Sequence, residues 1–254
     1  MHDESLLEPL VRVAREAGSA ILRVYATDFD VRHKADRSPV TDADLQAERL
    51  IVEALSALTP GVPIVSEEAA SEARAPAVAD RFWLVDPLDG TREFVRRNGE
   101  FTVNIALVQD RRPVLGLIYA PALERLYLGA AGHGAHAEID GQRRPIACRR
   151  PPPQGLVVVT SRSHQPTPAW VAMLGGRPVA AHTTAGSSLR FGLVASGQAD
   201  IYPRTGRTWE WDTAAGHAIV AAAGGHVTDA EGVELHYGKP NFANPGFAAY
   251  GLIT

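Results

Sequence analysis

The segment Trp83-Leu-Val-Asp-Pro-Leu-Asp-Gly-Thr-Arg-Glu-Phe94 places two aspartates, Asp86 and Asp89, where an apolar run gives way to a turn. Carboxylates are oxygen ligands that suit Mg²⁺, and two of them on one tight turn can hold adjacent ions. Gly90 allows the backbone to come close to a ligand. Thr91 begins a stretch that could start a helix, whose free N–H groups favour an anion such as phosphate. The segment therefore predicts a joint site for metal and phosphate.

The composition around this segment is that of an ordinary globular protein. The chain has 254 residues, 45% of them hydrophobic, and a formal net charge of −4. Polyanion binders usually carry a basic excess, so we expect no polynucleotide partner. The arginine pairs at 96–97, 143–144 and 149–150 lack interleaved aromatic residues, and we expect them to be solvated loop charges.

A single cysteine, Cys148, excludes an intrachain disulfide and a thiolate cluster. The first residues do not resemble a secretion signal, and no apolar run approaches the roughly 20 residues that span a bilayer. We therefore expect a cytoplasmic protein without a transmembrane segment.

Hydrophobic periodicity predicts the elements of the first half. Apolar residues recur at helical spacing over residues 5–25 and again over 41–58, where Pro60-Gly61 ends the pattern. Short apolar runs at 62–66, 81–85, 102–109 and 114–120 predict four strands of a largely antiparallel sheet.

The proline-rich stretch at 149–155 is the best candidate boundary, because three prolines fit neither a helix interior nor a central strand. We therefore predict a metal-binding half, residues 1–150, and a substrate-recognising half, residues 151–254, in one compact unit with the active site at their junction. In the second half we expect strands at 156–160, 199–203 and 246–253, and helices at 167–174, 187–196 and 213–223.

Further acidic residues lie at the ends of predicted elements. Glu67-Glu68 follows the first strand, Asp44 begins the second helix, and Asp212 precedes the helix at 213–223. Each has a structural alternative: Glu67-Glu68 a solvated strand end, Asp44 a first-turn acid favoured by the helix dipole, and Asp212 a helix N-cap.

Two segments together resemble the signatures of the lithium-sensitive, Mg²⁺-dependent inositol monophosphatase superfamily. These are Trp83 to Thr91 and Trp211-Asp-Thr-Ala-Ala-Gly216. The resemblance runs over nearly the whole chain and looks closest to the CysQ-type branch, the 3′(2′),5′-bisphosphate nucleotidases. Arg92 and Arg190 depart from the lysines common in that branch, which keeps the charge but changes the donor geometry. Other stretches that suggest this branch are 38–41, 66–68, 98–104, 161–164, 186–189 and 244–247.

The resemblance implies two to three Mg²⁺ ions. Glu67, Asp86 and the backbone carbonyl of Leu88 would bind the first, Asp86, Asp89 and Asp212 the second, and a weaker third ion would lie near Glu67. Asp44 and Thr91 would orient and deprotonate the attacking water, with Glu67 as a further catalytic residue. The implied fold is a layered αβαβα sugar-phosphatase arrangement, an α+β half with a largely antiparallel sheet followed by an α/β half.

For the substrate, the resemblance implies adenosine 3′,5′-bisphosphate, hydrolysed to AMP and phosphate in the service of sulfur assimilation. Its contacts would be Glu67, Leu88, Asp89, Gly90, Thr91, His164, Ser187, Arg190, Arg204 and Asp212. Singly, Arg190, Arg204 and His164 could equally be surface or turn residues. Two alternatives stay open: an inositol-monophosphate or sugar-phosphate phosphatase, and a catalytically silent sensor of Mg²⁺ and nucleotide. The oligomeric state and peripheral contact with the inner membrane also stay open.

Overall fold

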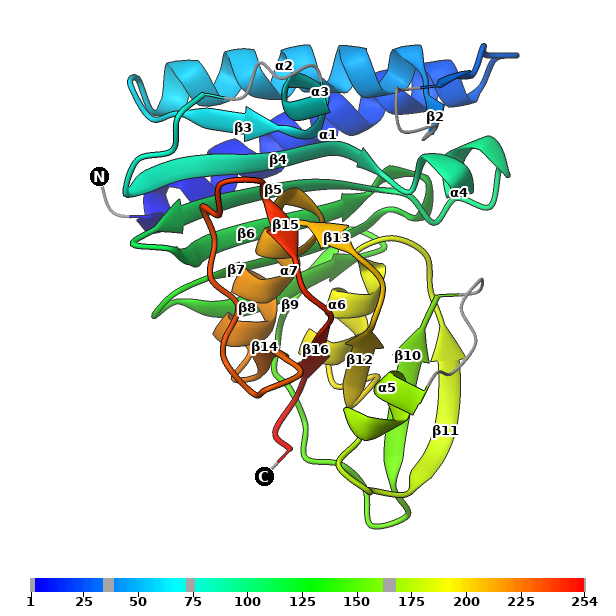
Figure 1. Cartoon of the computed structure of the whole chain (residues 1–254). Coiled ribbons are helices and arrows are strands. Elements are labelled where there is room, and N and C mark those ends of the chain that lie inside the picture. The colour runs from blue at the N-terminus through cyan, green and yellow to red at the C-terminus, as the bar shows by residue number, and fades with distance from the viewer. Residues whose placement is uncertain (1–2, 34–38, 72–75, 162–167, 254) are drawn as a thin grey trace.

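The computed structural model describes residues 3–33, 39–71, 76–161 and 168–253 and stacks them in five layers (Figure 1). Two long helices cover one face of a seven-stranded sheet. Two further helices lie between that sheet and a second, five-stranded sheet, and a short helix covers the outer face of the second sheet. This is the αβαβα arrangement that the sequence predicted.

The first layer consists of α1 (Leu7–Tyr25), which follows the short 3₁₀ helix η1 (Asp3–Leu6), and α2 (Asp42–Leu58). Thr41 caps α2: its side chain accepts the Ala43 N–H, and the Asp44 carboxylate accepts the Thr41 N–H. Both helices bury apolar stripes at helical spacing against the sheet, as predicted. None of the described helices combines the length and apolarity needed to cross a membrane.

The seven-stranded sheet has the order β3-β4-β5-β6-β7-β8-β9. Its strands are β3 (Ile64–Ser66), β4 (Arg81–Asp89), β5 (Thr102–Gln109), β6 (Arg112–Ala120), β7 (Arg125–Ala130), β8 (Gly134–Ile139) and β9 (Gln142–Ile146). The prediction of a largely antiparallel sheet is confirmed, with two differences. β3 pairs parallel to β4, and the hairpin strands β7 to β9 were not predicted. β9 is mostly exposed and rich in arginine, so it lacks the apolar alternation that identifies a strand.

Strand β4 is apolar on both faces. Phe82 and Leu84 contribute to the core on the α7 side, whereas Trp83 and Val85 contribute to the core beneath α1 and α2. Side chains of a strand alternate between its two faces, so a central strand covered on both sides needs an unbroken apolar run. The run that leads to Asp86 is thus explained by the position of β4 inside the layers.

Helix α7 (Glu210–Ala222) lies between the two sheets beside α6 (Leu189–Ala195). It approaches the first sheet closely at two strand glycines. A Cβ on Gly116 would lie 2.9 Å from the Ala215 Cα, and one on Gly129 would lie 2.9 Å from the Ile219 Cα. Backbone therefore packs on backbone here, which only glycine allows.

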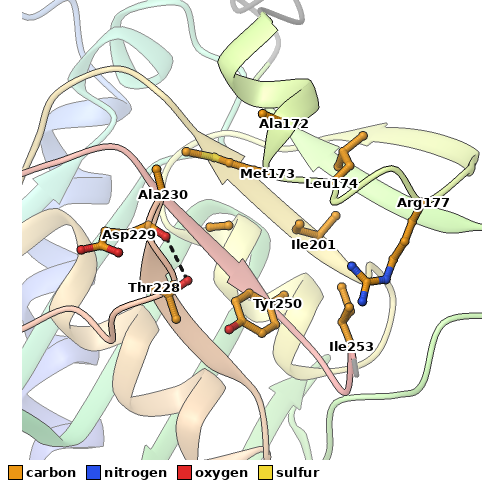
Figure 2. Close-up of a pocket in the computed structure, with 12 residues that line it drawn as sticks. Ala172, Met173, Leu174, Arg177, Ile201, Thr228, Asp229, Ala230, Tyr250 and Ile253 are labelled. Carbon is orange, nitrogen blue, oxygen red and sulfur yellow. Dashed lines mark hydrogen bonds between the residues drawn. The ribbon is translucent and has the colours of Figure 1, made fainter.

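The second sheet has the order β11-β10-β12-β16-β14 and mixes parallel and antiparallel pairs. It comprises β10 (Leu156–Thr160), β11 (Val179–Thr184), β12 (Ile201–Arg204), β14 (His226–Asp229) and β16 (Phe247–Tyr250). β10, β12 and β16 were predicted near these positions, but β11 and β14 were not. Helix α5 (Pro168–Ala172) lies on the outer face, where a cavity of about 280 Å³ opens beside it (Figure 2).

The two sheets separate between Ile146 and Leu156, close to the proline-rich stretch. One apolar core nevertheless joins them, because α6 and α7 of the second half pack against strands of the first. The division into residues 1–150 and 151–254 stays a prediction. What the layers do establish is that the start of α7 lies against the end of β4.

Candidate active site

Strand β4 does not end at Val85, as predicted from the sequence, but continues through a bulge to Asp89. Asp86 pairs with Asn104 and Asp89 with Thr102, so three steps along β4 oppose two steps along β5. This extra residue is a β-bulge. Residues three apart on a regular strand face opposite sides, but the bulge places both aspartates on the side that faces α7.

Local bonding at the bulge supports this geometry. The Asp86 carboxylate, which is 1% exposed, accepts the Leu88 N–H at 3.0 Å. Pro87 has no N–H to donate to a neighbouring strand. It lies in the bulge, where it has no partner in the β5 register, so the sheet loses no hydrogen bond to it. The Leu88 side chain turns to the opposite core, beneath α1 and α2. The bulge therefore combines an apolar anchor on one face with two carboxylates on the other.

Gly90 allows the loop before α6 to come close to the end of β4. Its φ is +87°, and a Cβ there would overlap the Ser187 hydroxyl. That hydroxyl lies 2.8 Å from the carbonyl oxygens of both Asp89 and Glu100. Ser187 itself has a φ of +49°, a left-handed conformation uncommon for residues other than glycine. The loop before α6 is thereby fixed against the end of β4.

Thr91 begins the short helix α4 (Thr91–Val95) and contacts the second helix of the first layer. Its Oγ1 lies 3.4 Å from the Asp44 Oδ1 and 3.4 Å from the Leu88 carbonyl oxygen. The other oxygen of Asp44 accepts two bonds of 2.8 Å from Thr41, one from its N–H and one from its hydroxyl. The capping box thus holds Asp44 by one oxygen and leaves the other directed at Thr91.

Asp212 is not the N-cap of α7, so that alternative is wrong. The helix begins one turn earlier than predicted, at Glu210, and Trp209 is its N-cap. Asp212 is therefore the third helical residue, and its Oδ2 accepts the Trp209 N–H at 2.7 Å. Burial, and then the negative charges of Asp89 and Glu67, raise its pKa well above the usual value, while Arg204 opposes this shift.

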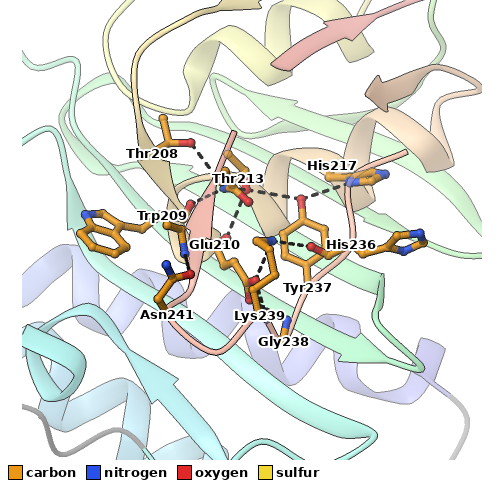
Figure 3. Close-up of polar contacts among 12 residues, drawn as sticks. Thr208, Trp209, Glu210, Thr213, His217, His236, Tyr237, Gly238, Lys239 and Asn241 are labelled. Atoms are coloured by element: carbon orange, nitrogen blue, oxygen red, sulfur yellow. Dashed lines mark hydrogen bonds and ion pairs between the residues drawn. The ribbon is translucent and has the colours of Figure 1, made fainter. Parts of the chain in front are cut away.

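The start of α7 is held by a buried polar network (Figure 3). Glu210 is fully buried, and its carboxylate accepts the Gly238 N–H at 2.7 Å and the Lys239 N–H at 2.9 Å. The Lys239 ammonium lies 2.7 Å from the same group. Hydrogen-bond donors on all sides make burial of this charge tolerable. The network anchors the first turn that carries Asp212.

A small cavity of about 80 Å³ lies where the ends of β4, α6 and α7 meet. Its lining includes the acidic residues Asp89 and Asp212, the hydroxyl residue Ser187 and the cations Arg190 and Arg204. The Arg190 guanidinium bonds the Ala185 carbonyl and lies over the Tyr202 ring, 4.8 Å from its centroid. Its Nε is buried and makes no hydrogen bond within the described residues. The cavity thus has two cations and two carboxylates in one lining.

Nine of the ten expected substrate contacts belong to described segments, whereas His164 lies outside the described residues. Glu67 begins the helix α3 (Glu67–Ser71), directly after β3, and acts on Asp212 through its charge. Within the described ranges, no group of three or more His, Cys, Asp or Glu side chains already has the arrangement to hold a metal ion. Metal ligation by these residues is therefore a proposal.

Sequence reasoning overlooked two buried residues of the site, Ser188 and Asn104. The Ser188 Oγ lies 2.8 Å from the Asp89 Oδ2, and the Asn104 amide donates to Ser188 at 2.8 Å. Both residues fell inside stretches that carried the family resemblance, at 98–104 and 186–189, but nothing in either stretch indicated that the two would meet.

A five-layer αβαβα fold with acidic motifs at the end of β4 and the start of α7 defines a class of proteins. A comparison of the sequence with models of known families identifies that class. Residues 2–250 match the model of the inositol monophosphatase family, and the chain belongs to that family.

Within this family, the chain is similar over nearly its whole length to proteins named CysQ. The chain is 49% identical over 249 residues to the 3′(2′),5′-bisphosphate nucleotidase CysQ of Salmonella typhimurium, an alignment that covers 95% of this chain and 98% of that protein. It is 48% identical to the CysQ of Escherichia coli K12, with the same coverage. Among solved structures, the CysQ of Bacteroides thetaiotaomicron superposes with a TM-score of 0.82 at 38% identity, covering 100% of this chain and 99% of that one.

Proposed function

We propose that this protein is a Mg²⁺-dependent phosphatase that removes the 3′-phosphate of adenosine 3′,5′-bisphosphate, giving AMP and inorganic phosphate. Two observations support the proposal. Relatives that match nearly the whole chain at 49% and 48% identity are named 3′(2′),5′-bisphosphate nucleotidase. The acidic motif residues also meet at one end of β4. In the cell, the reaction would serve sulfur assimilation.

The donor set fits Mg²⁺. Glu67, Asp86, Asp89, Asp212 and the Leu88 carbonyl oxygen offer only hard oxygen ligands. The pKa of Asp212 is raised because its carboxyl group is buried near the negative charges of Asp89 and Glu67. A divalent cation bound among these groups would offset that repulsion. These five residues would hold two to three ions. When bound, Mg²⁺ would neutralise charge on the phosphate and lower the pKa of a bound water.

Asp44 and Thr91 would prepare the attacking water. With its proton directed at the Asp44 Oδ1, and not at the equally distant Leu88 carbonyl oxygen, the Thr91 hydroxyl would present its lone pairs to a water molecule. As the water oxygen forms its bond to phosphorus, a proton would pass from water to Thr91 and from Thr91 to Asp44. The bond from phosphorus to the ribose 3′ oxygen would break with its electron pair on that oxygen, which takes a proton from solvent, while Asp44 releases its proton to solvent. The distance of 3.4 Å is long for a hydrogen bond, but such contacts often shorten once substrate is bound.

This contact between Thr91 and Asp44 is the observation that most favours a catalyst over a silent sensor. A protein that only binds Mg²⁺ and nucleotide needs the carboxylates, but it has no use for a hydroxyl directed at a buried aspartate beside them. The 47 residues that separate the two partners in sequence make an incidental local contact a poor explanation.

The cations of the cavity would recognise the nucleotide. Arg190 and Arg204 line the same cavity as Asp89 and Asp212, and a guanidinium binds phosphate oxygens in a fixed planar geometry. The buried Nε of Arg190 still has a proton to donate. We assign these two arginines, with Ser187 and His164, to the 5′-phosphate and ribose, while Gly90 and Thr91 would meet the phosphate that is cleaved.

Phosphate release tests the proposal. Adenosine 3′,5′-bisphosphate, inositol 1-phosphate and fructose 1,6-bisphosphate are compared in parallel, with Mg²⁺ present or chelated. We expect Mg²⁺-dependent turnover of the first substrate above the others. Asp89→Asn should reduce it at least about 100-fold, because even indirect changes to a metal site cost about 10–100-fold.

A matched control is Asp140→Asn, since Asp140 lies exposed in the hairpin between β8 and β9 at a φ of +51° that asparagine tolerates. Its activity should equal that of the wild type. Preference for either other substrate would change the substrate assignment, and the absence of turnover with all three would favour the sensor.

A further inference from the structure

Ser188 lies between Asp89 at the end of β4 and Asp212 at the start of α7. Its position in the chain suggests that its side chain caps a helix, but the structure shows a different role. It is the N-cap residue of α6, where a serine ordinarily accepts an N–H of its own helix. The Ser188 side chain makes no such capping bond. Its hydroxyl is instead directed across the layer at the end of β4.

We propose that Ser188 and Asn104 are positioning residues that hold the Asp89 carboxylate in place for metal binding. This inference rests on the proposed function, since it takes Asp89 to be a metal ligand. The two residues act through Asp89 and need not touch the reacting groups themselves.

A directed chain of hydrogen bonds carries the argument. The Thr102 hydroxyl donates to the Asn104 Oδ1 at 3.0 Å, and the Asn104 Nδ2 donates to the Ser188 Oγ at 2.8 Å. The Ser188 Oγ then donates to the Asp89 Oδ2 at 2.8 Å. The Asp89 carboxylate sets the orientation of the Asn104 amide, because the reverse orientation would place the amide oxygen, which cannot donate, 3.5 Å from the Asp89 Oδ2. Every donor in the chain is thus directed towards the carboxylate.

Burial makes this chain effective. Thr102, Asn104 and Ser188 are each at most 2% exposed, so water does not compete for their bonds. The last bond ends on a carboxylate, and hydrogen bonds to charged groups are about twice as strong as neutral ones. The Asn104 Nδ2 also lies 3.5 Å from the same Asp89 oxygen. The Oδ2 atom is therefore held, and the orientation of the Oδ1 atom is set with it.

The same hydroxyl also contacts the segment Trp211–Gly216, which carries Asp212. The Ser188 Oγ lies 3.1 Å from the backbone carbonyl oxygen of Asp212, in the first turn of α7. A hydroxyl has one proton, and the shorter, charge-assisted contact with Asp89 is the stronger of the two. Ser188 thus relates Asp89 on β4 to the turn that carries Asp212, two ligands 123 residues apart in the chain.

Mg²⁺ binding to the chelator-treated protein, measured by calorimetry, tests the inference without relying on turnover. Ser188→Ala should raise the Kd for Mg²⁺ by about 10–100-fold, the usual effect of removing a group that orients a metal ligand. Excess Mg²⁺ should restore much of the lost phosphate release. Ser196→Ala, at the other end of α6, is the matched control, because among the described residues its hydroxyl bonds only carbonyls of its own helix and the Gln198 side chain.

A double-mutant cycle separates positioning from a general structural role. If Ser188 acts through Asp89, Ser188→Ala should change the Kd little once Asp89→Asn is present. Equal fold-changes in both backgrounds would overturn the inference, as would an unchanged Kd in the single variant. Absence of Mg²⁺ binding by the wild type would instead refute the proposed function.

Thermal unfolding in chelator checks that each variant folds. If Ser188→Ala does not fold, Thr102→Val removes only the first donor of the chain at nearly constant volume. It should raise the Kd in the same direction by a few-fold, because each bond in a chain strengthens the next. No change in that variant would then overturn the inference.

Discussion

Replacing Gly116 with alanine tests how closely α7 must pack on the seven-stranded sheet. The new Cβ would overlap the Ala215 carbonyl oxygen and lie 2.9 Å from both the Ala215 Cα and the Ala218 Cβ. That is roughly 0.6 Å short of the 3.5 Å at which carbon atoms normally meet. Two of the three obstructing atoms belong to the backbone, so no side chain can turn away, and α7 itself must move.

The cost follows from this displacement. Forcing an extra carbon into a packed core costs about 1–3 kcal/mol, and one kcal/mol lowers the Tm by about 2–4 °C in a chain of this size. We therefore expect a Tm about 2–12 °C lower than that of the wild type. Activity should fall further than stability suggests, because α7 carries Asp212 and a shift of about 1 Å at a catalytic group can cost 100-fold.

Circular dichroism melting in chelator and Mg²⁺-dependent phosphate release measure the two effects. Gly206→Ala is the comparison for stability: its Cβ would lie 3.6 Å from its nearest neighbours, atoms of the Arg204 side chain, which is ordinary van der Waals contact. It should change the Tm little. A Gly116→Ala protein with the Tm and turnover of the wild type would refute the reasoning that backbone contact sets the depth of α7.

Two further predictions concern stability. Arg149→Ala should cost about 2–3 kcal/mol in urea unfolding, because Arg149 donates two bonds, of 2.9 and 3.1 Å, to the fully buried Asp200 and is itself partly exposed; an equal loss in Arg150→Ala, at the exposed neighbouring residue, would contradict this. Burial lowers the pKa of His217 below 6.5, against the opposing effect of the hydrogen bond that its ring donates to the Glu234 carboxylate, so the unfolded state takes up a proton first as the pH falls. Stability should therefore decline below about pH 6.5, and His217→Gln should flatten the fall in Tm between about pH 7 and 5.5. An unchanged slope in that variant would assign the decline to other groups.

The arginine pairs show what a charge pattern can and cannot predict. They were expected to be solvated loop charges, and Arg96, Arg144 and Arg150 are indeed exposed, although the pair at 143–144 lies on strand β9 and not in a loop. One member of each pair has a partner. Arg97 bonds the carbonyl oxygens of Tyr25 and Thr27 at the end of α1, Arg143 pairs with Glu8 and Glu138, and Arg149 with Asp200. Glu138 is five residues from Arg143, but the other partners lie 51 to 135 residues away, and no local pattern reports those.

What the sequence by itself determined was local. Helical spacing located α1 and α2, the apolar run before Asp86 located a central strand, and the residue types of the motifs indicated hard-oxygen chemistry. These inferences hold because side-chain periodicity and ligand preference depend on a few neighbouring residues. Boundaries were less certain: α7 begins at Glu210 because its first turn is anchored by Lys239, which lies 29 residues later.

Only the tertiary structure decided how the site is assembled. The bulge that turns Asp86 and Asp89 to one face arises from the register of β4 against β5. The diversion of Ser188 from capping to Asp89 arises from the packing of α6 beside that strand end. Both depend on contacts between distant parts of the chain, whose free energy comes from burying shared surface. A local pattern does not contain that information, so sequence could identify the acidic residues but not how they meet.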